Sequence, residues 1–245
     1  MGLPELTVLI PVFNEEGNIL PLLEEIASAL DGVAAYEVLF VDDGSSDGSA
    51  RELAEAQAAS PRVRVIRHRK RSGKSAALFT GFHAARGVWI QTLDGDRQND
   101  PKDVARIWKM IHAPLPPERL GIVAGRRKRR NDGIVKFFSS RIANFVRSAL
   151  LRDHTADTGC GFKLLRTSVA VKLPFFDGMH RFLPALVRRT GYDTMQDYIE
   201  DRPRIAGVSK YGFFGRLGAG IFDLFGVFWL IQRGTPGEGD EILRG

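Results

Sequence analysis

The sequence predicts an α/β protein with a doubly wound, mostly parallel sheet that is flanked by helices. Short apolar segments alternate with helical patterns through the first half of the 245 residues, which is typical of this class. The apolar segments carry Val, Ile and Leu at odd and even positions alike, as strands covered on both faces do. Acidic residues directly follow three of these segments, at the strand ends where such sheets bind ligands.

The predicted strands are short, and most are almost wholly apolar. The first, Leu6–Val12, reads LTVLIPV, and two others, Tyr36–Val41 and Val88–Leu93, run directly into acidic turns. Segments of this length and composition favour buried strands over helices. The remaining predicted strands are Val63–Arg67, Gly121–Ala124 and Thr194–Ile199.

Helical patterns lie between and after these strands. In Glu16–Leu30 the apolar residues recur at Ile19, Leu22 and Ile26, the spacing of one buried helix face. Pro101 suits the first turn of a helix. The remaining predicted helices are Asp47–Ala59, Lys74–Ala85, Pro101–Ile111, Lys136–Leu151 and His180–Arg189.

Composition narrows the function classes. Lys and Arg exceed Asp and Glu by 35 − 29 = 6, and a basic surface favours anionic partners such as nucleotides, acidic lipid or nucleic acid. The lone Cys160 excludes an internal disulfide and is expected to be a core residue. No leader pattern opens the sequence, so we expect a cytoplasmic protein. The most apolar stretch, Leu217–Gln232, is interrupted by Asp223 and is shorter than the roughly 20 residues of a membrane span.

The strongest chemical signal is Asp94-Gly95-Asp96 at the end of the fourth strand. Gly95 allows a tight turn between two carboxylates, which then converge on a hard cation such as Mg²⁺ or Mn²⁺ together with substrate phosphates. Gln98 and Asn99 are further oxygen donors within reach. The alternative interpretation is a polar loop with solvated acids.

Two other polar turns follow strands in the same way. Asp43, after the second strand, is expected to accept hydrogen bonds from a nucleobase or ribose, whereas Asp47 is expected to cap the next helix. After the first strand, Phe13 is placed to flank a base and Glu15 to contact the ligand. Each turn taken alone is equally compatible with a capped loop.

The motifs taken together resemble the family 2 glycosyltransferases with the GT-A fold, and most closely the polyprenyl- or dolichol-phosphate sugar synthases. The resemblance covers about residues 6–232. The motifs occur in the family's order: IPVFNEEGNI, VDDGSSDGS, SGKSAAL, DGDRQNDP, AGRR, DTGCGFKLL and RPRIAGVSKYG.

The resemblance implies roles for the matching residues. Nucleotide-sugar contacts are expected from Pro11, Phe13, Glu15, Asp43, Lys74, Asp94, Gly95, Asp96 and Arg126. The metal ligands implied are Asp94, Asp96 and Gln98. Phosphate groups of donor or acceptor would contact Arg126, Arg141, Arg204, Ser209 and Lys210. Direct catalytic roles are expected for Asp96, Asp157, Arg204 and Lys210, with Asp157 on the acceptor side.

The expected reaction is inverting transfer of a sugar from GDP-mannose or a UDP-sugar to a polyprenyl phosphate. Mg²⁺ or Mn²⁺ and guanidinium groups would stabilise charge on the leaving diphosphate. A phosphate acceptor is already anionic and needs no strong base, whereas a saccharide hydroxyl would need one, with Asp157 as the first candidate.

The resemblance also suggests how the chain is divided. A GT-A domain is expected at residues 1–211, with a nucleotide-sugar half at about 1–125 and an acceptor half at about 126–211. Residues 212–233 are expected to form amphipathic helices, and 234–245 a flexible tail. Aromatic residues with flanking cations in 212–233 favour peripheral contact with the cytoplasmic face of a membrane. A packing helix, a homo-oligomer interface or a membrane protein partner are alternatives for the same segment.

Three other functions compete with the lipid-phosphate transferase. A GT-A enzyme with a saccharide or other non-lipid acceptor would carry the same donor motifs. A nucleotidyltransferase would normally show a glycine-rich N-terminal phosphate loop, which IPVFNEE lacks. A nucleic-acid-binding protein would use the basic segments, but carboxylates at the strand ends would repel a phosphate backbone, so we expect no nucleic acid partner.

Overall fold

A computed structural model describes residues 3–113, 119–128, 147, 150–151, 153, 155–203 and 213–234. For residues 213–219 and 221 it describes the backbone alone. The described strands form one seven-stranded sheet in the order β3-β2-β1-β4-β6-β5-β7. Their bounds are β1 Leu6–Val12, β2 Tyr36–Asp42, β3 Val63–Arg67, β4 Trp89–Thr92, β5 Leu120–Arg127, β6 Lys163–Arg166 and β7 Asp193–Ile199.

One strand runs against the others. β6 is antiparallel to both of its neighbours, β4 and β5, whereas the other paired strands are parallel. All strands but β6 therefore end at the same edge of the sheet, and β6 begins there. This is the mixed, mostly parallel sheet that the sequence predicts.

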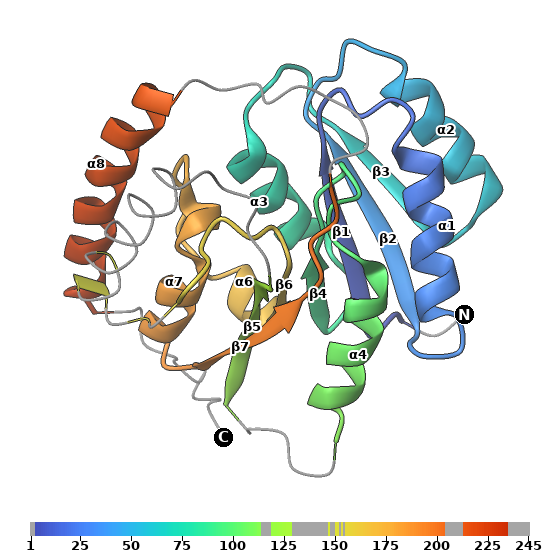
Figure 1. The fold of residues 1–245 in the computed structure, drawn as a ribbon. Coiled ribbons are helices and arrows are strands. Elements are labelled where there is room, and N and C mark those ends of the chain that lie inside the picture. Colours follow the sequence, from blue (N-terminus) through green and yellow to red (C-terminus); the bar gives the residue numbers. More distant parts are fainter. Residues whose placement is uncertain are drawn as a thin grey trace, which may run out of the picture.

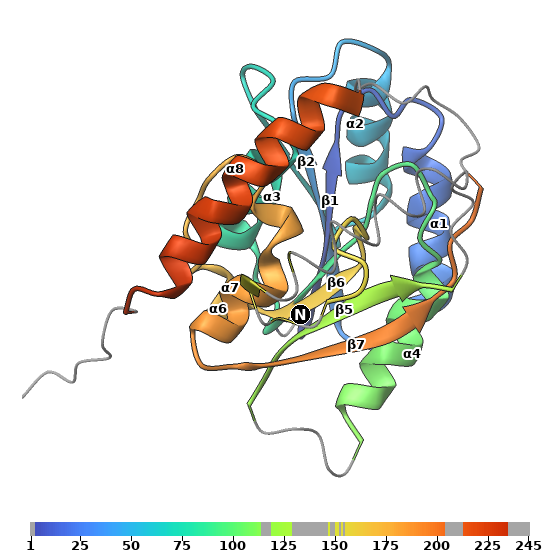
Figure 2. The same ribbon diagram turned by 60° about the vertical axis from the view of Figure 1, so that its left-hand side comes forward.

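Helices cover both faces of the sheet (Figures 1 and 2). One core cluster joins the sheet to α1 (Ile19–Leu30), α2 (Ser49–Ala59) and α4 (Pro101–Ile111). The other joins it to α3 (Lys74–Ala84), α6 (Thr167–Ala170), α7 (Leu183–Arg189) and α8 (Phe213–Ile231). Side chains of β1 alternate between these clusters, with Val8 and Ile10 in the first and Leu9 in the second. Burial on both faces explains the unbroken apolar sequence of the strands.

Most of the predicted elements are confirmed, and their ends shift by at most a few residues. The predicted helix His180–Arg189 is wrong in one respect, because a 3₁₀ turn at Met179–Arg181 is separate from α7. Pro184 has no backbone N–H and is tolerated only in a first turn, so α7 starts at Leu183. The strand β6 was not predicted. Most of the predicted helix Lys136–Leu151 lies outside the described residues; 147, 150 and 151 are helical.

The C-terminal helix α8 packs along the face that α3 and α7 cover (Figure 2). Val227 is buried in the second core cluster, and Leu224 and Phe228 pack against it. Within the described residues, no helix is both long enough and apolar enough to cross a membrane.

Candidate functional site

Polar residues from both halves of the chain meet at the edge where the parallel strands end. Because β6 is reversed, its first residue, Lys163, pairs with Thr92, the last residue of β4. The Thr92 hydroxyl donates a hydrogen bond to the carbonyl of Gly161 over 2.5 Å. The turn that precedes β6 therefore lies directly beside the acidic turn that follows β4.

Asp94 is held between a lysine and a glycine at this edge. The ammonium group of Lys74, the first residue of α3, donates to Oδ1 of Asp94. A Cβ atom at Gly161 would lie only 2.4 Å from Oδ2 of Asp94, so the carboxylate occupies space that a side chain at Gly161 would take. Burial opposes ionisation of Asp94, but the charges of Lys74 and Lys163 outweigh it and hold the pKa of Asp94 below its ordinary value.

The turn from Asp94 to Asp100 packs against the ends of β1 and β7. A Cβ at Gly95 would lie 3.3 Å from Cγ of Glu15, which places Glu15 beside the turn. Asp96 is buried, and its Oδ1 accepts a hydrogen bond from the backbone N–H of Gln98 over 3.2 Å. Asn99 forms a β-bridge with Asp201, two residues beyond the end of β7.

Four carboxylates converge here from three segments of the chain. Burial raises the pKa of Asp201, and the charges of Asp157, Asp96 and Asp94 raise it further against the opposing effect of Arg127. Contacts place these acids together, because Arg127 binds Asp157 and lies 3.9 Å from Asp201. Asn99 bridges to Asp201 and Gly161 lies against Asp94, so the four acids form one cluster. Its cations are Lys74, Lys163 and Arg127.

Asp157 is fully engaged by Arg127. The guanidinium group donates to both carboxylate oxygens, over 2.7 Å from Nε and 3.0 Å from Nη2, in the bidentate geometry of a strong ion pair. Asp157 is buried, and its hydrogen bonds and its charge raise the pKa of Arg127 against the effect of burial. The preceding residue, Arg126, is exposed, and its guanidinium lies over the ring of Tyr198, 5.0 Å from the centroid.

Lys163 is buried and His180 is half-buried next to the acidic cluster. Burial lowers the pKa of Lys163 to about 8, and its ammonium group donates to the carbonyl of Cys160. Burial also lowers the pKa of His180 well below its ordinary value, so the ring is neutral at pH 7. His180 Nδ1 lies 2.8 Å from the hydroxyl of Ser75. Cys160 is a buried core residue as predicted, and burial raises the pKa of its thiol to about 11.

The predicted nucleoside side lies at the ends of β1 and β2. Asp43 is buried and accepts hydrogen bonds from the backbone N–H groups of Ser72 and Gly73, over 2.8 and 2.7 Å, and lies 2.8 Å from the His68 ring. It therefore holds the basic loop before α3 against the sheet edge. The guanidinium of Arg71, in the same loop, lies 4.2 Å from the ring centroid of Phe13.

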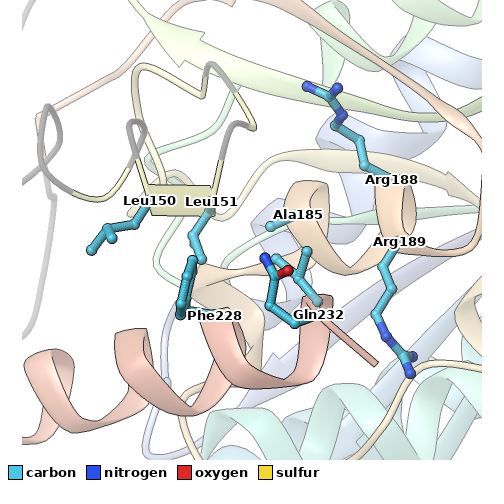
Figure 3. Close-up of a pocket in the computed structure, with 8 residues that line it drawn as sticks. Leu150, Leu151, Ala185, Arg188, Arg189, Phe228 and Gln232 are labelled. Atoms are coloured by element: carbon cyan, nitrogen blue, oxygen red, sulfur yellow. The ribbon is translucent and has the colours of Figure 1, made fainter. Parts of the chain in front are cut away.

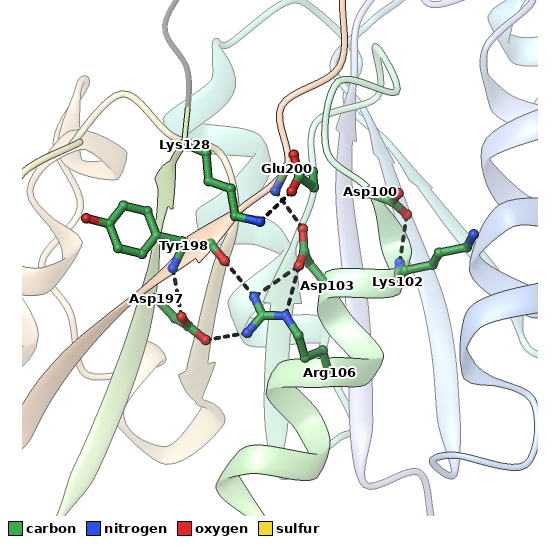
Figure 4. Close-up of polar contacts among 8 residues, drawn as sticks. All are labelled: Asp100, Lys102, Asp103, Arg106, Lys128, Asp197, Tyr198 and Glu200. Atoms are coloured by element: carbon green, nitrogen blue, oxygen red, sulfur yellow. Dashed lines mark hydrogen bonds and ion pairs between the residues drawn. The ribbon is translucent and has the colours of Figure 1, made fainter.

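A polar network fixes the end of β7 to α4 (Figure 4). Arg106 of α4 donates to Asp103, to Asp197 over 2.6 Å and to the carbonyl of Tyr198 over 2.6 Å. The backbone N–H of Glu200 donates to Oδ2 of Asp103 over 2.8 Å. These contacts hold the residue before Asp201, and so they set where that carboxylate enters the cluster.

The structure brings together a part of the predicted site. Asp94, Asp96 and Asp157 lie in one cluster, with Lys74 beside them, and Gly95 and Glu15 are in contact. Gln98 bonds through Nε2 to the carbonyl of Arg202 over 3.3 Å. Four predicted residues lie outside the described part of the chain, namely Arg141, Arg204, Ser209 and Lys210.

Three residues of the cluster were not predicted. Arg127, Lys163 and Asp201 were not among the predicted site residues. Two of them lie in motifs that already held predicted residues. Lys163 follows Asp157 in DTGCGFKLL, and Arg127 follows Arg126 in AGRR.

Among the described residues, no group of three or more His, Cys, Asp or Glu side chains is arranged to hold a metal ion by itself. A cation held by Asp94 and Asp96 would need further ligands, such as oxygen atoms of a bound diphosphate. That division of ligands is typical of Mg²⁺, which is often bound by one or two carboxylates plus substrate phosphates.

A cavity of about 600 Å³ lies away from the acidic cluster, between α7, the end of α8 and residues 150 and 151 (Figure 3). Arg189, which ends α7, donates to the carbonyls of Leu230 and Gly234 over 2.9 and 2.8 Å and so caps the end of α8. The cavity is lined by Leu150, Leu151, Ala185, Arg188, Arg189, Phe228, Ile231 and Gln232.

Comparisons with known proteins identify the family of this chain. The model of the family described as Glycosyl transferase family 2 matches residues 7–173. The chain is 33% identical over 242 residues to the dodecaprenyl-phosphate galacturonate synthase of Rhizobium johnstonii, covering 96% of this chain and 70% of the relative. It is 31% identical over 209 residues to the undecaprenyl-phosphate 4-deoxy-4-formamido-L-arabinose transferase of Aeromonas hydrophila, covering 84% of this chain and 62% of the relative. The chain thus spans about two thirds of the length of these relatives.

The fold also matches solved structures. Glucosyl-3-phosphoglycerate synthase from Mycobacterium tuberculosis, solved with Mn²⁺, UDP-glucose and glycerol 3-phosphate, superposes with a TM-score of 0.67. The match covers 96% of this chain and 82% of that one, at 18% sequence identity. At this identity the likeness establishes the shared GT-A fold and nothing finer.

Proposed function

Because the chain belongs to glycosyl transferase family 2, we propose that it transfers a sugar from a nucleoside diphosphate to a polyprenyl phosphate in a reaction that requires a divalent cation. The observation that carries the proposal is the convergence of four acids and three cations at one edge of the sheet, from Asp94 to Asp201. Two relatives whose names state polyprenyl-phosphate acceptors support the acceptor class.

The residues at the site fit a divalent cation. Asp94 and Asp96 offer carboxylates from one tight turn, and Gln98 adds a side-chain amide oxygen. Asp94 already pairs with the ammonium group of Lys74, so this carboxylate is accessible to a positive charge. A bound Mg²⁺ or Mn²⁺ would stabilise the charge that develops on the departing diphosphate.

The state of Asp157 favours a phosphate acceptor over a sugar hydroxyl. A hydroxyl acceptor needs a carboxylate free to take its proton, but both oxygens of Asp157 are held by Arg127. A phosphate monoester is anionic at neutral pH and attacks without losing a proton to the enzyme. In this proposal Asp157 keeps Arg127 in place, and Arg127 and Lys163 supply positive charge for phosphate groups.

The outer face of α8 supports docking at a membrane surface, where a polyprenyl phosphate resides. Phe222, Phe225 and Trp229 are 85, 60 and 58% exposed, and their spacing of three and four residues places them on one side of the helix. The guanidinium of Arg233 lies 5.1 Å from the Trp229 ring centroid. Aromatic side chains with a flanking cation are typical of helices that lie in the bilayer interface.

The test of the metal and donor is a thermal-shift panel of nucleotide sugars with Mn²⁺. A cognate donor should raise the unfolding temperature with Mn²⁺ present and much less with EDTA. Asp96→Ala should remove the Mn²⁺-dependent part of the shift, and Asp47→Ala, which alters a capping acid outside the cluster, should keep it. A variant at Asp96 with undiminished Mn²⁺-dependent turnover would refute the metal assignment.

The test of the acceptor is transfer from the cognate donor to a short-chain polyprenyl phosphate. The product should be a polyprenyl glycosyl phosphodiester that resists mild base and has inverted anomeric configuration, and the nucleoside diphosphate is released. Free saccharides, glycerol 3-phosphate and the dephosphorylated polyprenol serve as controls. Transfer to a saccharide hydroxyl at a comparable rate would contradict the proposed acceptor class.

A further inference from the structure

A non-glycine residue with a left-handed backbone lies inside the proposed metal-binding turn. Among the described non-glycine residues, positive φ angles occur at Asn14 (54°) and Arg97 (60°). Asn adopts this conformation readily, but a long side chain such as Arg does so at an energetic cost. Arg97 lies between Asp96 and Gln98, so the backbone of Arg97 determines how those two neighbouring side chains are oriented.

One carboxylate on α1 holds Arg97 in place. Oε1 of Glu25 accepts from Nη2 and Nε of Arg97 over 2.5 and 3.2 Å. Its other oxygen, Oε2, accepts from Nη1 of Arg202 over 2.6 Å. The side chains of Glu25, Arg97 and Arg202 are 24, 20 and 32% exposed, so water screens these pairs less than it would at the open surface.

Arg202 binds the same turn at its C-terminal end. Its backbone N–H donates to the carbonyl of Gln98 over 2.9 Å, and its own carbonyl accepts from Gln98 Nε2. Nη2 of Arg202 pairs with Asp100, the cap of α4, over 2.6 Å. Glu25 is therefore bound to the middle of the turn through Arg97 and to its end through Arg202.

We propose that Glu25 is a positioning residue for the cation site. Its hydrogen bonds to Arg97 and Arg202, which we call the Glu25 clamp, keep the Asp96–Gln98 turn in the geometry that binds the metal. The inference rests on the proposed function, because it assumes that Asp96 and Gln98 hold the cation. The turn is strained at Arg97, and loss of the clamp lets the backbone leave the left-handed region. Asp96 and Gln98 then reorient, although the cation has lost none of its ligands.

The test compares Mn²⁺ binding by Glu25→Gln and by the neighbouring variant Glu24→Gln. Glu24 is exposed and adjacent, so it matches the change in charge without touching the clamp. The dissociation constant of Mn²⁺ is measured from the electron paramagnetic resonance of free Mn²⁺, with GDP and with UDP present. Glu25→Gln should weaken Mn²⁺ binding about tenfold, as loss of a partner that orients a ligand typically does. Glu24→Gln should bind Mn²⁺ as the wild type does.

A second pair of variants, made in a protein that carries Arg97→Gly, separates loss of the Glu25 clamp from a general loss of structure. Glycine adopts positive φ freely, so Arg97→Gly removes the strain that the clamp opposes. In the Arg97→Gly background, Glu25→Gln should cost little further Mn²⁺ affinity. The same variants should show turnover that recovers at saturating Mn²⁺, because the ligands themselves are intact. If Glu25→Gln does not fold, Glu25→Asp, which is too short to reach both arginines, should show the same weakening.

The outcomes distinguish the two proposals. A wild-type protein that binds no Mn²⁺ with either nucleotide overturns the proposed function. A wild-type protein that binds Mn²⁺, with equal affinity in Glu25→Gln and Glu24→Gln, overturns the positioning role alone. An undiminished effect of Glu25→Gln in the Arg97→Gly background also overturns it, because the carboxylate would then act by another route.

Discussion

A single methyl group at Gly161 should displace Asp94 from the site. A Cβ at this position would lie 2.4 Å from Oδ2, 2.5 Å from Cγ and 2.5 Å from Oδ1 of Asp94. Because all three carboxyl atoms are this close, rotation of the carboxylate alone leaves the clash in place. Gly161 does not have a positive φ angle, so alanine is compatible with its backbone and the clash with Asp94 is the main effect of the change.

The size of the displacement sets the expected loss of activity. Side-chain Cβ atoms do not approach other heavy atoms within 3.0 Å, so the carboxylate must move by at least 3.0 − 2.4 = 0.6 Å. A misplacement of about 1 Å at a reacting centre costs roughly 100-fold in rate. We expect Gly161→Ala to lose about 30-fold in kcat/KM, which corresponds to about 2 kcal/mol of transition-state stabilisation.

The global stability should change much less than the activity. The Asp94 side chain is 29% exposed, so it can swing toward solvent without leaving a buried cavity behind. The free energy of unfolding, measured by urea titration, should fall by no more than about 1 kcal/mol. Activity is measured as metal-dependent release of nucleoside diphosphate from the donor.

The chain offers a matched control in the same turn. At Gly159 the nearest atoms to an added Cβ are Arg127 Nη2 and Asp157 Oδ1, both at 3.8 Å, which is ordinary contact distance. Gly159→Ala should therefore keep nearly full activity. In an Asp94→Ala background, Gly161→Ala should cost nothing further, because the group it displaces is gone. Equal activity of the two glycine variants, or full additivity with Asp94→Ala, would refute the steric argument.

Three further predictions concern the cluster, the core and the membrane surface. Arg127→Ala should lower turnover more than Arg126→Ala, since it removes the bidentate arginine partner of the buried Asp157 carboxylate; steady-state kinetics of both variants checks the order. Arg147→Met should reduce the free energy of unfolding by about 3–5 kcal/mol in urea titration, because it removes the arginine that pairs with the buried Asp153 carboxylate. Trp229→Ser should weaken co-flotation with vesicles that contain phosphatidylglycerol. It should leave thermal stability nearly unchanged, because the Trp229 ring is exposed. Unchanged flotation would contradict the membrane contact.

The parallel strands could be predicted because burial on both faces leaves a plain signal. Leu6–Val12 and Val63–Arg67 are matched at both ends, since each continuous β-rich segment stops at a polar turn. β6 escaped prediction because it has four residues and begins with Lys163 directly after a glycine-rich turn. Its place between β4 and β5 is decided by tertiary pairing, which no local pattern reports.

The two adjacent arginines, Arg126 and Arg127, show a second limit of prediction from the sequence. Successive side chains of a strand point to opposite faces of the sheet, so the motif AGRR places one arginine near the acids and the other away from them. The structure puts Arg127, which was not predicted, on Asp157 and Arg126 over Tyr198, and the phosphate contact expected of Arg126 stays a prediction. The register of β5 against β7 shifts between Leu120 and Ile122, and such an irregularity changes which residue faces the site without leaving a mark in the sequence.

The balance of charge in the cluster connects the site to its proposed ligands. Asp94, Asp96, Asp157 and Asp201 face Lys74, Lys163 and Arg127, so the described acids and cations almost cancel. A nucleoside diphosphate entering alone would meet four carboxylates, and a divalent cation alone would meet three cations. The two together bring nearly compensating charges and add oxygen ligands to Asp94 and Asp96. Such a site favours the cation and the diphosphate as a pair over either one separately, so each should raise the affinity for the other. That mutual dependence suits the proposed transfer, because a cation bound together with the diphosphate would stabilise the leaving group as the sugar departs.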